Sequence, residues 1–231
     1  MHFINTITFI PLLRVNMDFR KKLEQLLIRI EKASHSNHPV QLIAVSKYAT
    51  IEQIKALYAC GQCAFGENKI QDYQTKSNAL QDLPLEWHML GVLQHNKINK
   101  LLALKPTLLH SLHSLELAEA IQTRAKEPLN ALLQVNIAEE SSKSGISPNL
   151  ALQTYLTISQ TCPQIHLKGL MVIGPLNATR VQTESVFKKA KKLFDQLPHA
   201  QILSMGMSGD FEIAIACGSN MVRIGNALFE N

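Results

Sequence analysis

Short apolar segments alternate with helical segments along almost the whole chain, and this alternation limits the possible folds more than any other feature of the sequence. Many of the apolar segments are rich in β-branched residues, so they predict buried strands. They lie at residues 40–45, 63–66, 87–91, 107–110, 131–136, 167–173, 201–205 and 221–224. Between them the sequence predicts helices, at residues 50–61, 70–80, 96–104, 115–125, 148–159, 182–197 and 211–216.

Eight strands separated by helices, with no long break in composition, predict an α/β protein built as a single (β/α)8 TIM barrel. The length of 231 residues lies in the usual range for that fold. An amphipathic helix precedes the first strand, with Asp18 as its expected N-cap, and we expect it to plug the lower end of the barrel. A doubly wound open sheet gives the same alternation and is the structural alternative.

The first residues of the chain differ from the rest. Residues 3–15 are apolar, but Asn5 and Pro11 interrupt them, no basic segment precedes them, and they are too short to span a bilayer. Met17 is followed at once by the periodic helix. We therefore expect residues 1–16 to be a disordered tail or an upstream mis-start, and residues 17–231 to form one barrel domain.

Composition excludes several classes of protein. With 46% hydrophobic and 18% charged residues, the chain can bury a core and is neither disordered nor fibrous. The net charge of +5 comes from scattered basic residues, which favours a solvated surface over a nucleic-acid or membrane partner. Four cysteines are too few for a disulfide framework and favour a reduced, cytoplasmic protein. Cys60 and Cys63 form a C-x-x-C motif without a second pair nearby, so we expect no metal site.

In a TIM barrel the active site lies where strands end and the following loops begin. The residues in these positions combine one lysine and one arginine with small and amide residues, namely Ser46, Lys47, Gly66, Asn68, Gly91, Asn136, Gly206, Ser208, Arg223, Gly225 and Asn226. A lysine at the barrel mouth is partly withdrawn from water, which favours the neutral amine that forms Schiff bases. A snorkelling surface lysine is the alternative.

The last two loops indicate an anion opposite the lysine. Gly206 and Gly225 would let backbone amides approach a ligand closely, and Ser208 would cap the next helix and help to hold an anion. Glycines that only form turns are the alternative. A Schiff-base lysine that faces a phosphate cradle is typical of a pyridoxal phosphate (PLP) site.

Arg223 fits the same interpretation. An arginine against the pyridine nitrogen stays charged and leaves that nitrogen unprotonated, so the cofactor is a weak electron sink and demanding carbanion chemistry is disfavoured. Asn68 and Asn136 would either orient the ring hydroxyl or cap turns. For His88 we expect core packing or a hydrogen bond to a loop, and for His110 and His113, which lack an obvious carboxylate partner, a structural role.

Several motifs occur together and in a fixed order. They are LIAVSK at 42–47, FGEN at 65–68, WHMLG at 87–91, QVN at 134–136, SKSG at 142–145, LKGLM at 167–171, LSMGMS at 203–208 and MVRIG at 221–225. With them the sequence resembles the pyridoxal phosphate homeostasis proteins, which have the barrel of the alanine racemase N-terminal domain. The resemblance covers nearly everything from Asp18 to Phe229.

The resemblance implies that Lys47 carries PLP as a Schiff base, that Arg223 faces the pyridine nitrogen, and that Ser208, Gly225 and Asn226 hold the phosphate. It also implies a carrier and buffer that passes PLP to apo-enzymes and is not itself an enzyme. The expected cofactor-binding residues are Lys47, Asn68, Ser204, Gly206, Ser208, Arg223, Gly225 and Asn226, with no catalytic and no metal-binding residue. The chain departs from the family at Asn226, where Thr or Ser is usual, and at Tyr48, Gly174-Pro175 and His113.

Two enzymes on the same barrel are the alternatives to a carrier. An amino-acid racemase needs a second acid or base on the opposite face of the cofactor ring, which racemases take from an extra β domain. None of the four tyrosines suits that role, and we expect Tyr48 to alternate away from Lys47. A Schiff-base aldolase without PLP shares the lysine. Because a single barrel does not require a partner copy, we expect a monomer.

Overall fold

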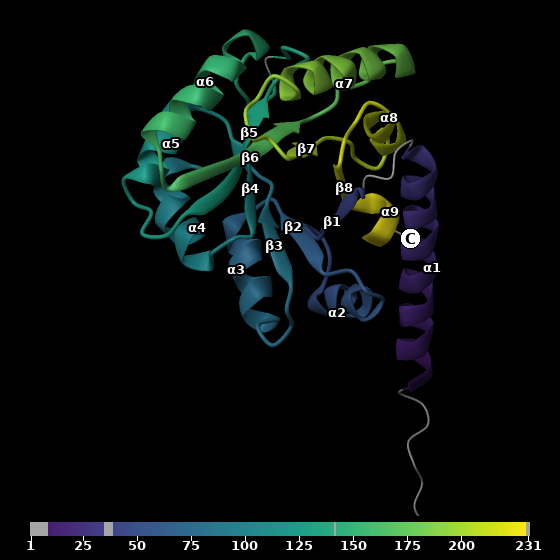
Figure 1. Ribbon diagram of the computed structural model, residues 1–231. Coiled ribbons are helices and arrows are strands. Elements are labelled where there is room, and N and C mark those ends of the chain that lie inside the picture. The colour runs from purple at the N-terminus through teal and green to yellow at the C-terminus, as the bar shows by residue number, and fades with distance from the viewer. Residues whose placement is uncertain (1–8, 35–38, 141, 230–231) are drawn as a thin grey trace, which may run out of the picture.

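The structure, a computed structural model, describes residues 9–34, 39–140 and 142–229. In this part of the chain, eight parallel strands close into a barrel in chain order (Figure 1). The strands are β1 (Gln41–Val45), β2 (Ala64–Glu67), β3 (Glu86–Met89), β4 (Leu108–Leu112), β5 (Leu129–Val135), β6 (Ile165–Val172), β7 (Ile202–Ser204) and β8 (Met221–Ile224). Pairing of β1 with β8 closes the sheet, which confirms the TIM barrel and excludes the open doubly wound sheet.

A helix follows each strand. The described helices are α1 (Phe9–Ala33), α2 (Ile51–Ala59), α3 (Ile70–Ala79), α4 (Ile98–Leu104), α5 (Leu115–Gln122), α6 (Pro148–Thr161), α7 (Arg180–Phe194), α8 (Phe211–Ala216) and α9 (Asn226–Phe229), with a 3₁₀ turn η1 (His95–Lys97) before α4. The N-terminus of α2 has the expected capping box, because the Thr50 hydroxyl accepts from the Gln53 amide and the Gln53 side chain accepts from the Thr50 amide. The sequence did not predict α9.

Helix α1 differs from its prediction in two respects. It begins at Phe9, so Asp18 lies inside the helix and pairs with Lys22 at 3.2 Å instead of capping it. It packs on the outside of the barrel, against α2, α8 and α9, rather than plugging the lower end (Figure 1). Its buried residues are Phe19, Leu23, Leu26 and Ile30. Residues 1–8 lie outside the described residues, and the tail assigned to 1–16 stays a prediction.

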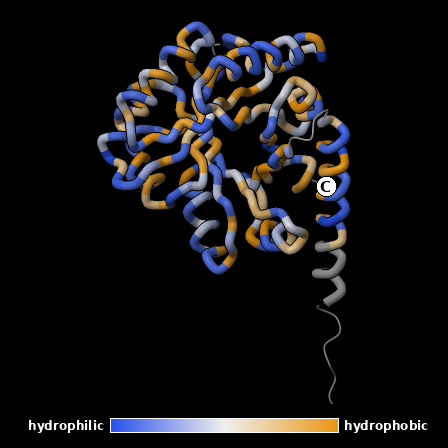
Figure 2. The backbone as a smooth tube through the Cα atoms, viewed as in Figure 1, coloured by the Kyte–Doolittle hydropathy of each residue, from blue (hydrophilic) through white to orange (hydrophobic). Residues whose placement is uncertain are grey.

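Apolar residues form two cores. One lies between the strands and the helices, and Figure 2 shows polar and apolar residues mixed along the helices that cover it. The other lies inside the barrel and forms a layer that we call the lower layer. The lower layer consists of Ile43, Ala64, Leu108, Leu132, Met171 and Met221. None of the described helices is long and apolar enough to cross a membrane.

A polar layer lies inside the same barrel, nearer the carboxyl ends of the strands. Side chains alternate between the two faces of a strand. The side chains two positions beyond Leu108, Leu132 and Met221 therefore also point inward, and they are His110, Gln134 and Arg223. We call this set the upper layer. It consists of His88, His110, Gln134, Ser204 and Arg223, all of them buried. It lies directly beneath the face where the candidate site is expected.

Candidate functional site

The expected site residues gather on one side of the barrel mouth. Strands β7, β8, β1 and β2 are neighbours in the closed sheet, and the candidate residues follow or end these four strands. Lys47 lies in the turn after β1 and Asn68 directly after β2. Ser204, Gly206 and Ser208 come from β7 and its loop, and Arg223, Gly225 and Asn226 from β8 and the start of α9.

The backbone that carries Lys47 is anchored by a buried charge pair. The Ser46 hydroxyl donates to Glu67 Oε1 at 2.7 Å, and the Ser46 amide donates to the Gly66 carbonyl at 2.9 Å. Lys76 of α3 donates to the same Glu67 oxygen at 2.7 Å and to the Ser46 carbonyl at 2.6 Å. Sequence reasoning missed this anchor, because Glu67 and Lys76 look like ordinary strand and helix charges.

Lys47 is half-buried, and its amine contacts the neighbouring aromatic ring. Its Nζ lies 4.7 Å from the centre of the Tyr48 ring, and Tyr48 itself is 83% exposed. The prediction that Tyr48 points away from Lys47 is wrong, because the strand ends at Val45 and a turn replaces strand alternation. Lys47 takes part in none of the ion pairs formed within the described residues.

Arg223 is a buried cation held by neutral groups. It is 5% exposed, and its guanidinium donates to the Ser204 hydroxyl at 2.7 Å and to the Val172 carbonyl at 3.0 Å. Burial lowers the pKa of Arg223 to about 10, although the charge of Asp210 acts to raise it. Arg223 is therefore still a cation at neutral pH. No carboxylate forms an ion pair with it in the part of the chain that the structure describes.

The loops after β7 and β8 approach their neighbours closely. Gly206 has a φ of +99°, and a Cβ there would lie 2.7 Å from the Ala214 Cβ, so the position requires glycine. A Cβ on Gly225 would lie 3.1 Å from the Val45 carbonyl oxygen. The first contact packs the β7 loop against α8, and the second fixes the β8 loop beside the end of β1, next to Lys47.

Ser208 does not cap the next helix, so that prediction is wrong. Helix α8 begins at Phe211 after Asp210, and Ser208 lies half-buried in the preceding turn. Asp210 Oδ1 accepts from the Met207 amide at 2.6 Å and holds this turn. Burial raises the pKa of the Asp210 carboxyl. This effect outweighs the hydrogen bond from the Met207 amide and the charges of Arg223 and Lys143, which lower the same pKa.

Asn136 caps a turn, which is one of the two roles considered for it, the other being to orient the ring hydroxyl. Its Nδ2 donates to the carbonyls of Glu140 and Lys143, at 2.8 and 3.2 Å. Lys143, in the same loop, donates to the Gly174 carbonyl at 2.6 Å and pairs with Glu140 at 2.9 Å. Its amine is therefore occupied in tying the β5 loop to the β6 loop.

Two buried histidines lie beneath the site and are connected to Arg223 through Ser204. His88 Nδ1 lies 2.9 Å from His110 Nε2, and His110 Nδ1 lies 3.3 Å from the Ser204 hydroxyl that accepts from Arg223. Burial lowers the pKa of His88 to about 4 and that of His110 well below its usual value, so both rings are neutral. The sequence placed both residues on adjacent strands, but it did not give the register that brings their rings together.

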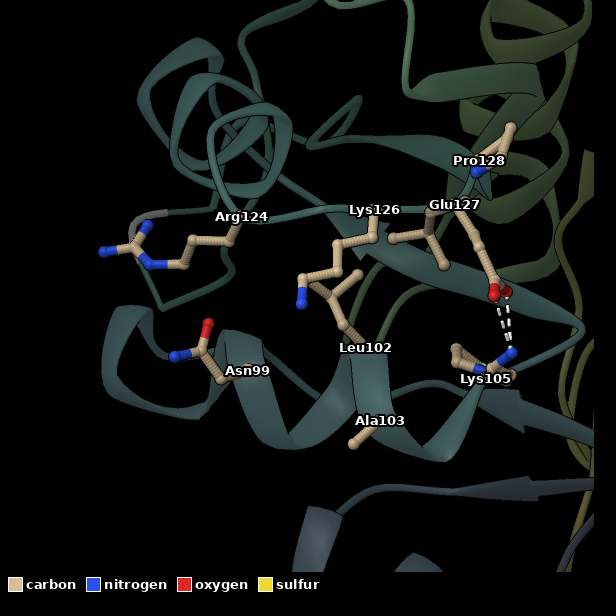
Figure 3. Close-up of a pocket in the computed structure, with 10 residues that line it drawn as sticks. Asn99, Leu102, Ala103, Lys105, Arg124, Lys126, Glu127 and Pro128 are labelled. Carbon is tan, nitrogen blue, oxygen red and sulfur yellow. Dashed lines mark hydrogen bonds and ion pairs between the residues drawn. The ribbon is translucent and has the colours of Figure 1, made fainter.

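A separate pocket, drawn in Figure 3, is lined mainly by residues that precede β4 and β5 and therefore lies at the end of the barrel opposite the candidate site. It has a volume of about 580 Å³ and lies between the end of α4 and the start of β5. Arg124 and Lys126 line it, and Lys105 at one end pairs with Glu127 at 2.8 Å. None of the expected site residues borders this pocket.

The comparisons with known proteins agree on the fold and on the family. The model of the alanine racemase N-terminal domain matches residues 22–230. A pyridoxal phosphate homeostasis protein of Helicobacter pylori is 54% identical over 220 residues, which cover 93% of this chain and 99% of that protein. The structure of PipY from Synechococcus elongatus with PLP bound is 35% identical, with a TM-score of 0.79 over 91% of this chain and 99% of PipY.

A more distant structure shares the fold alone. The alanine racemase of Corynebacterium glutamicum is 15% identical, with a TM-score of 0.71, and the match covers 95% of this chain and 62% of the racemase.

Proposed function

This chain belongs to the pyridoxal phosphate homeostasis protein family, and on that premise we propose that it binds PLP covalently at Lys47 and acts as an intracellular carrier and buffer of PLP. It passes PLP to apo-enzymes and has no substantial turnover of its own. It works as a monomer, since every candidate residue belongs to one barrel. We place it in the cytoplasm, where its four free thiols are stable.

The observation that carries the proposal is Arg223. A buried cation without a carboxylate partner costs free energy, and an electron-rich ligand in the site would offset that cost. The pyridine nitrogen of PLP is such a group, and it accepts a hydrogen bond without removing the charge of the guanidinium. The residues of the site therefore fit PLP.

Lys47 supplies the covalent bond in this proposal. Its amine adds to the aldehyde carbon of PLP and one water leaves, so that a C=N bond replaces the C=O bond. Addition of water reverses the reaction, as a carrier requires. The anchor of Ser46 on Glu67 and Lys76 holds the start of the turn in place, which orients the amine toward the site.

The two loops beside Lys47 hold the phosphate in this proposal. Gly206 lets the β7 loop pack against α8, Gly225 keeps the β8 loop close to β1, and Ser208 and Asn226 provide polar side chains at the rim. Phosphate sites of TIM barrels commonly use the loops after the seventh and eighth strands and the start of a short extra helix, which here is α9. Asn68 lines the other side of Lys47.

An amino-acid racemase is the alternative, and the position of Tyr48 does not favour it. The Tyr48 ring contacts the amine of Lys47 and so lies on the same side as Lys47, whereas a racemase needs its second acid or base on the opposite face of the cofactor ring. Tyr73 and Tyr155 are buried and donate to the carbonyls of Leu104 and Leu167, so neither is free to serve. Incubation with L- and D-alanine separates the candidates, because turnover on the order of 1 per second or faster would establish a racemase.

The absorption spectrum of the purified protein, incubated with PLP and then reduced with borohydride, tests the carrier. We expect a Schiff-base band in the unmodified protein and a reduced adduct that peptide mapping assigns to Lys47. The Lys47→Ala variant should show neither. Lys69→Ala is the matched control, because Lys69 is an exposed lysine that follows the adjacent strand. An adduct that persists in Lys47→Ala, or a protein that takes up no PLP, would refute the proposal.

A further inference from the structure

Four side chains from four strands form one continuous row of contacts in the upper layer. Arg223 of β8 donates to Ser204 of β7 at 2.7 Å, the Ser204 hydroxyl lies 3.3 Å from His110 Nδ1 of β4, and His110 Nε2 lies 2.9 Å from His88 Nδ1 of β3. All four residues are buried. The row starts at the cation of the candidate site and ends inside the barrel.

The protons in this row have one consistent direction. Arginine only donates, so the Ser204 oxygen is an acceptor toward Arg223 and its own proton is free to go to His110 Nδ1. His110 then carries its proton on Nε2 and donates to His88 Nδ1, and His88 carries its proton on Nε2. Only the His88 Nε2–H is left without a partner, which agrees with the one unpartnered atom of the row.

The opposite direction is less favourable. If His110 Nδ1 donated to Ser204, His88 would have to donate to His110, and the Ser204 proton would have no acceptor in the row. Two buried groups would then be unpaired, the Ser204 hydroxyl proton and the His88 Nε2 lone pair, instead of one. Hydrogen bonds that run away from a cation also polarise one another in the same direction.

The charges around the row support this assignment. Burial lowers the pKa of both histidines, and the charge of Arg223 adds to the effect on His110, so the rings stay neutral beside the guanidinium. Within the described residues, Arg223 is thus hydrogen-bonded only to neutral groups, and Asp210 acts on its charge without forming an ion pair.

We propose that Ser204, His110 and His88 form a one-way hydrogen-bond relay that fixes the orientation of Arg223, so that its remaining N–H groups are presented to the ring nitrogen of PLP. This inference rests on the proposed function for its ligand. Ser204 is accordingly a positioning residue: it is fully buried and acts on the cofactor through Arg223. The two histidines fix the direction of the Ser204 proton.

The first test uses the protein without PLP and so does not depend on the proposed function. Long-range ¹H–¹⁵N NMR spectra of histidine-labelled protein should show His88 and His110 as neutral rings that both carry the proton on Nε2. Ser204→Ala should move the His110 signals. Ser111→Ala is the matched control, because this buried serine next to His110 donates to the Gly91 carbonyl and lies outside the relay. A charged ring, a proton on Nδ1 of His110, or unchanged signals in Ser204→Ala would overturn the relay.

The second test measures release of PLP from loaded protein. Loss of one hydrogen bond to a charged group should make PLP dissociate about ten-fold faster from Ser204→Ala, and its absorption band should shift. Ser204→Thr, which keeps the hydroxyl, should restore the band and the rate, and Ser111→Ala should match the unmodified protein. If Ser204→Ala and Ser111→Ala release PLP equally fast, Ser204 has no positioning role. Failure of the unmodified protein to bind PLP would instead refute the proposed function and leave the NMR result standing.

Discussion

The lower and upper layers of the barrel share strands β4, β5 and β8, on which they lie two residues apart, yet they are chemically opposite. The lower layer is wholly apolar, from Ile43 on β1 to Met221 on β8. The upper layer contains a cation, two histidines, a serine and a glutamine, and two of its buried polar atoms, His88 Nε2 and Gln134 Oε1, are unpartnered. Since unpaired buried polar groups cost free energy, the lower layer should stabilise the barrel and the upper layer should serve the site.

The largest effect on stability should come from the lower layer. Leu132 is fully buried there, and Leu132→Ala removes its apolar contacts and leaves a cavity. We expect the free energy of unfolding to fall by about 2–5 kcal/mol, measured by urea denaturation. Binding of PLP by the folded variant should be unchanged, because Leu132 does not reach the upper layer.

Met171→Leu is the matched control in the same layer. It conserves volume, so we expect it to cost less than about 1.5 kcal/mol. Equal losses in Leu132→Ala and Met171→Leu would show that the lower layer is loosely packed, and the contrast between the layers would fail.

A smaller effect should come from acidifying the upper layer. The pKa of His88 is lowered to about 4, with burial as the cause, and that of His110 is lowered by burial, by His88 and by Arg223. Below the ordinary histidine pKa of about 6.5, these two histidines bind protons in the unfolded chain but stay neutral in the folded protein. Stability is therefore complete above that pH and falls as the pH drops toward 4, by on the order of 2 kcal/mol at pH 5 from His88 alone.

Urea denaturation at several pH values checks this dependence. His88→Gln removes one of the two titrating groups, so its stability should fall less steeply between pH 6.5 and 5. An exposed histidine provides the matched control, and His95→Gln should keep the slope of the unmodified protein. If His88→Gln and His95→Gln have the same slope, His88 is not a neutral buried ring.

Most of the fold and the location of the site followed from the sequence, for identifiable reasons. Strands of three to eight residues with apolar inward positions give a strong signal, and a parallel barrel places their carboxyl ends together. Helix caps were predicted less well. Asp18 and Ser208 are good capping residues, but Asp18 lies inside α1, which begins at Phe9, and Ser208 lies before the start of α8 at Phe211. The side-chain positions of Tyr48 and Lys76 depend on turns and helix packing that no local pattern encodes.

The sequence did not predict the hydrogen-bonded row in the upper layer, and the reason is different. His88 and His110 are 22 residues apart, and each taken alone resembles an ordinary core histidine. Their contact depends on the register between β3 and β4, where His88 pairs with Leu108, two residues before His110. A sequence pattern that gives the inward face of a strand does not give the register between strands, so the two rings could not be connected before the structure.

The smallest effect on stability should come from Arg223→Met, although this residue is central to the site. Methionine removes a buried cation whose transfer from water is costly, and it leaves the Val172 carbonyl without its guanidinium donor. These two changes oppose each other, so we expect the free energy of unfolding to fall by no more than about 1 kcal/mol. Affinity for PLP, followed by titration of the absorption band, should fall at least about ten-fold, because the charged donor is lost. A loss of stability as large as that of Leu132→Ala would mean that Arg223 holds the barrel together, and the two layers would then differ in polarity but not in role.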